Sequence, residues 1–108
     1  MLDLNHPQSK YIFAAARLED AIRDGANHIM AAQPSERGEL LAACEQHLAS
    51  MRTLNADHFR SSPSIALIID ELQVALRALA MSESPHFDII WPALSRLESE
   101  EGFGTFAI

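Results

Sequence analysis

The stretch SSPSIALIIDELQVALRALAM, residues 61–81, decides the fold because it predicts a helix with apolar side chains on two opposite sides. Ser62 suits a helix N-cap, and Pro63 suits a first helical turn, where a missing N–H has no intrahelical partner. The first stripe repeats at three- and four-residue steps and consists of Ile65, Ile68, Ile69, Leu72, Leu76 and Leu79. The second stripe lies on the opposite side and consists of Leu67, Val74, Ala78 and Met81. A helix of this kind is either central in its fold or packs one side on another chain.

Breaks that contain Ser and Pro separate three further predicted helices from this one. We expect helices at residues 7–31, at residues 36–54 and from about Ser84 onward. Pro92 lies inside the last segment. Because proline lacks a backbone donor and disfavours helical geometry at the residue before it, we expect a kink or a restart there. No segment alternates regularly between polar and apolar residues, so no sheet is predicted.

The sequence therefore predicts an all-α fold, in which residues 1–108 form a single small domain of about four helices, the last one kinked at Pro92. Residues 1–6 are expected to form an N-terminal arm, and residues 102–108 an apolar C-terminal tail. In the first helix the apolar positions continue in phase through Gly25. This favours one helix weakened by a glycine, with a break at Gly25 as the alternative.

Composition and charge argue against several classes of partner. The chain has 15 acidic and 8 basic residues and a net charge of -7. Such a charge repels phosphate backbones and anionic lipid, so we expect no direct nucleic-acid binding and no membrane partner. The longest strongly apolar run, IALII at residues 65–69, is far too short to span a bilayer. Cys44 is the only cysteine, which excludes a disulfide within the chain and makes a cytoplasmic location the simplest interpretation.

Few residues in the sequence are candidates for catalysis or metal binding. Cys44 and His47 stand three apart in the second predicted helix, a spacing compatible with two metal ligands or with a nucleophile and its base. We favour a core cysteine beside a boundary histidine, because two ligands do not make a closed metal site. The four-helix organisation around His47 also resembles the histidine phosphotransfer domains, but LAS follows His47 where those domains carry a lysine and a small residue. We therefore expect no enzyme activity and no cofactor.

Two apolar features remain as candidate binding surfaces. The second stripe is either covered by the fourth helix and the tail, or forms a dimer patch or docking surface. The tail either packs on its own domain, or binds a partner through side-chain pockets or by adding a strand to a sheet edge. Phe59, between the second and third predicted helices, is a weaker candidate of the same kind. The expected partner or dimer-interface residues are Leu67, Val74, Ala78, Met81, Phe103, Phe106, Ile108 and Phe59.

With SSPSIALIIDELQVALRAL, residues 61–79, at its centre, this small, acidic, helical chain resembles the QslA-type antiactivators of bacterial quorum sensing. The resemblance implies a homodimer that binds the ligand-binding domain of a LuxR-type transcription activator. It implies that the bound domain can no longer dimerise or reach DNA. The alternative binding class is a type III-like secretion chaperone, which is also small, acidic and dimeric but holds an unfolded segment of an exported protein.

Overall fold

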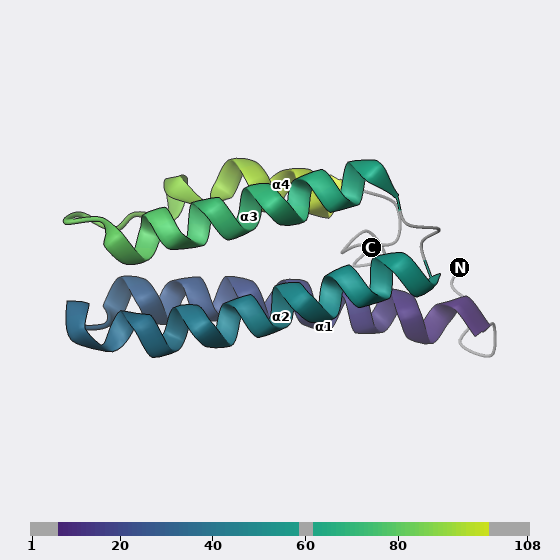
Figure 1. Ribbon diagram of the computed structural model, residues 1–108, viewed down its shortest axis with the longest axis horizontal. Helices are drawn as coiled ribbons and strands as arrows, with labels where there is room; N and C mark the ends of the chain where they lie inside the picture. Colours follow the sequence, from purple (N-terminus) through teal and green to yellow (C-terminus); the bar gives the residue numbers. More distant parts are fainter. Residues whose placement is uncertain (1–6, 59–61, 100–108) are drawn as a thin grey trace.

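Four α-helices form the computed structural model, which describes residues 7–58 and 62–99 (Figure 1). The helices are α1 (Pro7–Ala31), α2 (Arg37–His58), α3 (Pro63–Met81) and α4 (Trp91–Ser99). Two short 3-10 helices, η1 (Pro34–Glu36) and η2 (Phe87–Ile89), precede α2 and α4. The described ranges contain no strand, which confirms the all-α prediction. The predicted arm, residues 1–6, and the predicted tail, residues 102–108, lie outside the described residues.

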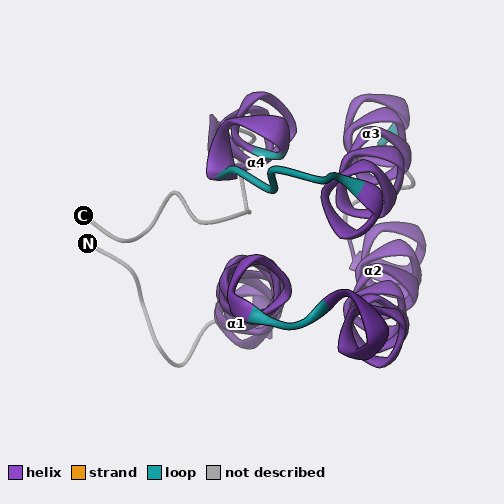
Figure 2. Cartoon of the chain, turned by 90° about the vertical axis from the view of Figure 1, so that its left-hand side faces the viewer, coloured by secondary structure: helices purple, strands orange, loops and turns teal. Residues whose placement is uncertain are grey.

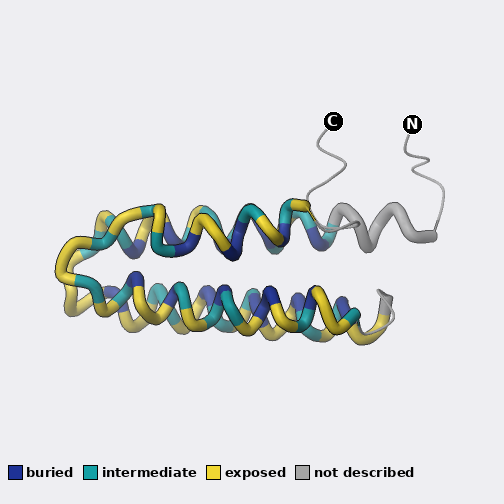
Figure 3. The backbone as a smooth tube through the Cα atoms, turned by 90° about the horizontal axis from the view of Figure 1, so that it is seen from above, coloured by how far each residue is buried: buried dark blue, intermediate teal, exposed yellow. Residues whose placement is uncertain are grey.

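The helices form two layers, each an antiparallel pair joined by a short connection. One layer consists of α1 and α2, and the other of α3 and α4 (Figure 1). Figure 2 shows the four helices nearly end-on, with α4 opposite α1 and α3 opposite α2. The buried positions recur along the inner sides of the helices, toward the middle of the bundle (Figure 3). Because α4 has 9 residues and α1 has 25, α4 covers only part of the length of α1.

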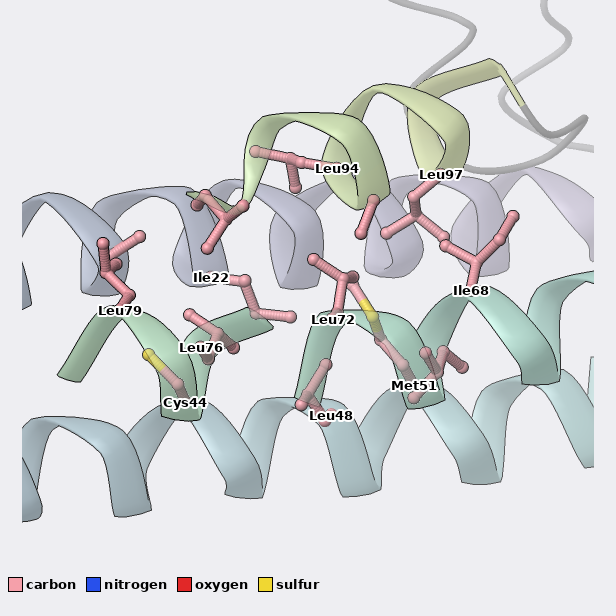
Figure 4. Close-up of a cluster of buried hydrophobic side chains, with 14 of the residues drawn as sticks. Ile22, Cys44, Leu48, Met51, Ile68, Leu72, Leu76, Leu79, Leu94 and Leu97 are labelled. Carbon is pink, nitrogen blue, oxygen red and sulfur yellow. The ribbon is translucent and has the colours of Figure 1, made fainter. Parts of the chain in front are cut away.

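The interior is built around the first stripe of α3. All six of its side chains are buried, as the sequence predicts. They form one cluster with Ile22 of α1, with Leu48 and Met51 of α2, and with Leu94 and Leu97 of α4 (Figure 4). Burying a Leu or Ile side chain stabilises a fold by about 1.5–3 kcal/mol. Six such side chains on one side of α3 therefore fix how this helix is rotated about its own axis.

The second helix continues to His58, so its predicted end near Leu54 is wrong by about one turn. The reason is a polar residue, Asn55, that extends the buried side of α2 beyond Met51, its last buried apolar residue. Its Nδ2 donates to the backbone carbonyl of Ser62 at 3.1 Å, and its Oδ1 accepts from the backbone N–H of Ser62 at 3.0 Å. A buried amide with both of its groups bonded in this way carries little desolvation penalty.

The last predicted helix is interrupted just before Pro92 instead of bending there. Residues Phe87–Ile89 form η2, and α4 begins at Trp91, which places Pro92 in its first turn. A first-turn residue needs no intrahelical donor, so the missing N–H breaks no helical bond. Ile90 links the two pieces, since its N–H donates to Phe87 and its carbonyl accepts from Leu94, both at 3.0 Å. The sequence therefore predicted the interruption in the right place.

Arg37 ties together the ends of three helices. It is buried at the start of α2, and its Nε donates to the carbonyl of Ala32, just after α1, at 3.3 Å. Its Nη1 donates to the carbonyls of Ser82 at 2.9 Å and Ala80 at 3.4 Å, at the end of α3. The last carbonyls of a helix have no intrahelical donor, and a cation there also interacts favourably with the helix dipole. Arg37 thus joins the two layers at one end of the bundle.

The helix α1 runs unbroken through Gly25, as the favoured interpretation held. A Cβ atom at Gly25 would lie 2.4 Å from Sγ of Cys44 on α2. Real carbon and sulfur atoms do not approach so closely without displacement. The glycine therefore allows α1 and α2 to pack closely, at a position where alanine would otherwise favour the helix by about 1 kcal/mol.

We expect Gly25→Ala to lower the free energy of unfolding by about 1–3 kcal/mol in spite of its better helix propensity, because the buried Cys44 side chain must move. Cys44→Ala removes the obstructing sulfur, so the double variant should be more stable than the sum of the two single losses predicts. Urea denaturation of the four proteins measures this coupling. A coupling energy near zero would show that the two side chains do not compete for the same space.

Glu19 is a buried carboxyl group on α1, with 4% of its surface exposed. Its Oε1 lies 2.8 Å from Nη2 of Arg23, and Arg23 also forms an ion pair with Glu98 of α4. Desolvation raises the pKa of Glu19 to about 7, although the charge of Arg23 opposes the shift. A hydrogen bond with Asp20 and the negative charge of Asp20 raise it further. Folding therefore favours the protonated form of Glu19.

We expect the free energy of unfolding to fall between pH 5 and pH 8 because of Glu19. The raised folded-state pKa, about 7 against an ordinary 4.5, gives a stabilising contribution that is complete below pH 4.5 and is lost as the pH rises through 7. Glu19→Gln cannot titrate, so its stability relative to the unmodified chain should rise by about 1–3 kcal/mol from pH 5 to pH 8. Denaturant titration of both proteins at both pH values measures the difference. A constant difference contradicts the raised pKa.

Candidate protein-binding face

The second stripe of α3 points away from the core. Leu67 is 59% exposed, Val74 is 68% exposed and Met81 is 84% exposed, and Ala78 is also exposed. Seven-residue steps correspond to two helical turns, so the three large side chains form one line along α3. Of the two alternatives for this stripe, cover by α4 does not occur, because α4 packs against the first stripe instead. The four residues therefore stand together on one surface, as the sequence predicted.

A shallow groove of about 430 Å³ runs beside the second stripe, between α3 and η2. It is lined by Asp70, Glu71, Val74, Ala75, Ala78 and Ile89. The alanines keep the floor of the groove low, since they carry the smallest side chains that still form a strong helix. The two carboxylates lie toward the N-terminal end of the groove. On the edge of α3 that faces α4, Glu71 forms an ion pair with Arg96 of α4.

The opposite edge of the stripe, toward α2, carries a row of connected polar groups. Nη1 of Arg52 lies 2.6 Å from Oδ1 of Asp70, and Nη2 of Arg77 lies 2.8 Å from Oε2 of Glu45. Gln73 stands between the two pairs, accepting from Arg52 at 3.0 Å and donating to Glu45 at 2.9 Å. The hydrogen bonds from Gln73 and Arg77 lower the pKa of Glu45, which keeps it charged. An apolar line thus has a charged border on both sides.

The remaining predicted interface residues are not placed by the structure. Phe59, Phe103, Phe106 and Ile108 lie outside the described residues. The described part of the chain adds one aromatic feature that the sequence did not single out as a site. Trp91 is 43% exposed at the start of α4, and its ring centroid lies 5.8 Å from that of Phe87 in η2.

Sequence reasoning missed the groove and the charged border of the second stripe. Asp70 and Arg77 follow Leu67 and Val74 by three residues, a spacing that makes side chains neighbours on a helix, so a signal for the border was present. Ile89 gave no comparable signal. It joins the groove only because η2 packs against α3.

The predicted chemical residues lie elsewhere, between α1 and α2. Cys44 is buried, as expected for a core cysteine, and His47 is half-buried. Both line a small groove together with Asp24 and His28. Burial raises the pKa of the Cys44 thiol, with a smaller contribution from the charge of Glu45, and a protonated thiol is a poor nucleophile. Among the described residues, no three His, Cys, Asp or Glu side chains converge as a metal site requires.

No helix within residues 7–58 and 62–99 combines the length and the apolar character needed to cross a bilayer. No known protein family matches the sequence, and neither a curated protein nor a solved structure is significantly similar to it. The function is therefore argued from the arrangement of the chain's own residues.

Two leucines of α3 provide a matched test of the exposed face. We expect Leu67→Ala to change the free energy of unfolding by less than about 0.5 kcal/mol, because Leu67 lies on the surface. Leu72→Ala removes a fully buried side chain of the same helix and should lower it by about 2–5 kcal/mol. Denaturant titration followed by circular dichroism measures both. Equal losses would mean that the second stripe belongs to the core.

Proposed function

We propose that the chain is a small regulatory module that binds another protein through the second stripe of α3. The specific form of the proposal is an antiactivator, whose partner is the ligand-binding domain of a LuxR-type quorum-sensing activator. The supporting observation is the exposure of Leu67, Val74 and Met81 on a helix whose opposite side is fully buried. Apolar side chains gathered on one exposed face are unfavourable in water and favour burial against a partner.

The face has the composition of a protein interface. Interfaces typically combine an apolar centre, which supplies affinity, with a polar rim, which supplies orientation and specificity. Here the centre is the second stripe, and the rim consists of the charged residues along its two edges, among them Asp70, Arg77 and Glu71. A partner that covers the stripe would contact both.

Helix α3 also has a suitable shape for a partner with an apolar groove. It is 19 residues long and is held rigidly by its buried side, so little conformational entropy is lost when its outer side is bound. An exposed helix with apolar anchors at regular spacing fits the mode in which a helix lies in a groove of its partner. Leu67, Val74 and Met81 are the anchors in this proposal.

The proposed mechanism is competition for the partner's own dimer surface. An activator that binds an operator with two half-sites needs two copies joined through an isologous interface. A helical protein that covers this interface leaves a monomer that spans only one half-site. If the antiactivator binds tenfold more tightly than the activator binds itself, its advantage is about 1.4 kcal/mol at matched concentrations.

The charge of the chain is consistent with action through a protein. The net charge of -7 opposes contact with the phosphate backbone of DNA. The same charge raises the rate of encounter with a partner whose surface is basic. Regulation of transcription by this chain therefore requires a protein intermediary in the proposal.

We expect Val74→Glu to weaken binding to the activator's ligand-binding domain at least tenfold, because it places a charge at the centre of an interface that excludes water. Ala42→Glu is the matched control, since Ala42 is exposed on α2 and adds the same charge away from the second stripe. Isothermal titration calorimetry with the purified domains of LuxR-type activators from the source bacterium measures the affinities. A reporter fusion to an activator-dependent promoter should be repressed by the unmodified chain and by Ala42→Glu, but not by Val74→Glu.

Three results would contradict the proposal. Equal binding by Val74→Glu and Ala42→Glu would remove the second stripe as the binding face. Binding to an unfolded segment of an exported protein, without binding to a folded activator domain, would identify a secretion chaperone. Transfer of phosphate to His47 from a phosphorylated receiver domain would identify a phosphotransfer protein.

A further inference from the structure

The charges that border the second stripe are distributed unevenly between its two edges. Asp70 and Arg77 lie on the edge toward α2, where they contact Arg52 and Glu45. The edge toward α4 carries Glu71, which contacts Arg96 there. The side chains of Asp70 and Arg77 are 63% and 57% exposed, so both remain accessible beyond these contacts. Among the charged residues of α3 itself, one edge therefore carries both signs of charge, and the other carries only Glu71.

Val74 marks the midpoint of the second stripe, seven residues from both Leu67 and Met81. If two copies of α3 pack antiparallel about a two-fold axis beside Val74, Leu67 of each copy lies opposite Met81 of the other. About such an axis, the edge of α3 toward α2 in one copy lies against the same edge of α3 in the second copy. Asp70, four residues before Val74, then lies opposite Arg77, three residues after it, within about one helical rise of 1.5 Å along the axis.

Parallel packing of the same two faces gives an unfavourable arrangement. A two-fold axis along the helices exchanges the edges and places Asp70 opposite Glu71 of the second copy. Like charges across an interface are repulsive, and parallel helix dipoles add to the repulsion. The charges along α3 therefore favour the antiparallel orientation and disfavour the parallel one.

We infer that the second stripe of α3 is self-complementary, and that a second copy of this chain occupies it as an antiparallel, isologous dimer with Val74 at the two-fold axis. Each interface then contains two reciprocal Asp70–Arg77 pairs. Together with the contacts within each chain they form rows of alternating charge, from Arg52 through Asp70 to Arg77 and Glu45 of the second copy. Extended networks of this kind contribute more than isolated surface ion pairs.

The dimer deepens the proposed function and rests on it in one respect, since the activator would need the same face. Dimerisation and partner binding then exclude each other. The second stripe spans about 21 Å, from 14 steps of about 1.5 Å, which is short for an interface of about 800 Å² per partner. A small interface gives a weak, reversible dimer. The dimer covers the second stripe at high protein concentration and dissociates when a partner binds the stripe more tightly.

Charge exchange tests the orientation with purified chain alone. Asp70→Arg places arginine opposite Arg77, and Arg77→Asp places aspartate opposite Asp70, so each variant should dimerise at least tenfold more weakly than the unmodified chain. An equimolar mixture of the two variants restores opposite charges at both pairs and should form a heterodimer about as tight as the original dimer. Analytical ultracentrifugation measures all three, and circular dichroism confirms that the helices are intact.

The outcomes separate this inference from the proposed function. Dimerisation of each single variant at the original strength, or failure of the mixture to associate, overturns the antiparallel dimer but leaves partner binding open. Tighter association of Asp70→Arg alone would indicate the parallel arrangement and also overturns it. If the heterodimer forms, addition of the activator's ligand-binding domain should dissociate it. A ternary complex would show that the two partners use different faces, and failure of the domain to bind at all would count against the proposed function only.

Discussion

The burial of the first stripe of α3 against the three other α-helices is the constraint on which the rest of the structure depends. Its six side chains are buried, and α3 packs against α1, α2 and α4. Rotation of α3 by half a turn would expose this apolar surface and bury Asp70, whose charge has no compensating partner in the core. The orientation of α3 is therefore fixed by its inner side, and its outer side points away from the three other α-helices. The candidate binding face is a by-product of core packing in this sense, since the core decides where Leu67, Val74 and Met81 point.

Hydrophobic burial fixes rotation, but polar contacts fix the position of the helices along their axes. If one helix slides along its neighbour by one turn, an apolar contact is replaced by a similar apolar contact at modest cost. A hydrogen bond to one particular carbonyl is lost completely. Arg37 at one end of the bundle binds carbonyls near the ends of α1 and α3, and Asn55 near the other end of α2 binds the backbone at Ser62. The two buried polar residues therefore set how α2 and α3 are placed relative to each other along their axes.

The parts of the structure that could be predicted from the sequence are those that depend on periodicity within one segment. The two stripes of α3, the helix through Gly25 and the interruption at Pro92 all follow from local spacing and backbone chemistry. The parts that could not be predicted depend on contacts between distant residues. Asn55 has no apolar character that would extend α2, and only its pairing with Ser62 explains the added turn. Likewise the sequence assigns α4 to either stripe of α3 equally well, and the choice is made by the packing of Leu94 and Leu97. The face itself was therefore predictable as a pattern, but its exposure was not.

The charges of the chain act differently on its two proposed partners. Two copies bring together a net charge of -14, twice the -7 of one chain, and this repulsion acts over the whole surface of both molecules. The attraction between Asp70 and Arg77 of opposite copies acts only at contact. This attraction can select an orientation of the two copies. It is opposed by the long-range repulsion between their net charges, which salt screens beyond about 8 Å at physiological ionic strength. A partner with a neutral or basic surface covers the same apolar anchors without that repulsion. If the dimer and the partner complex bury equal apolar area, electrostatics therefore favours the complex with such a partner. The acidic character of the chain thus makes self-association the weaker of the two proposed interactions of α3.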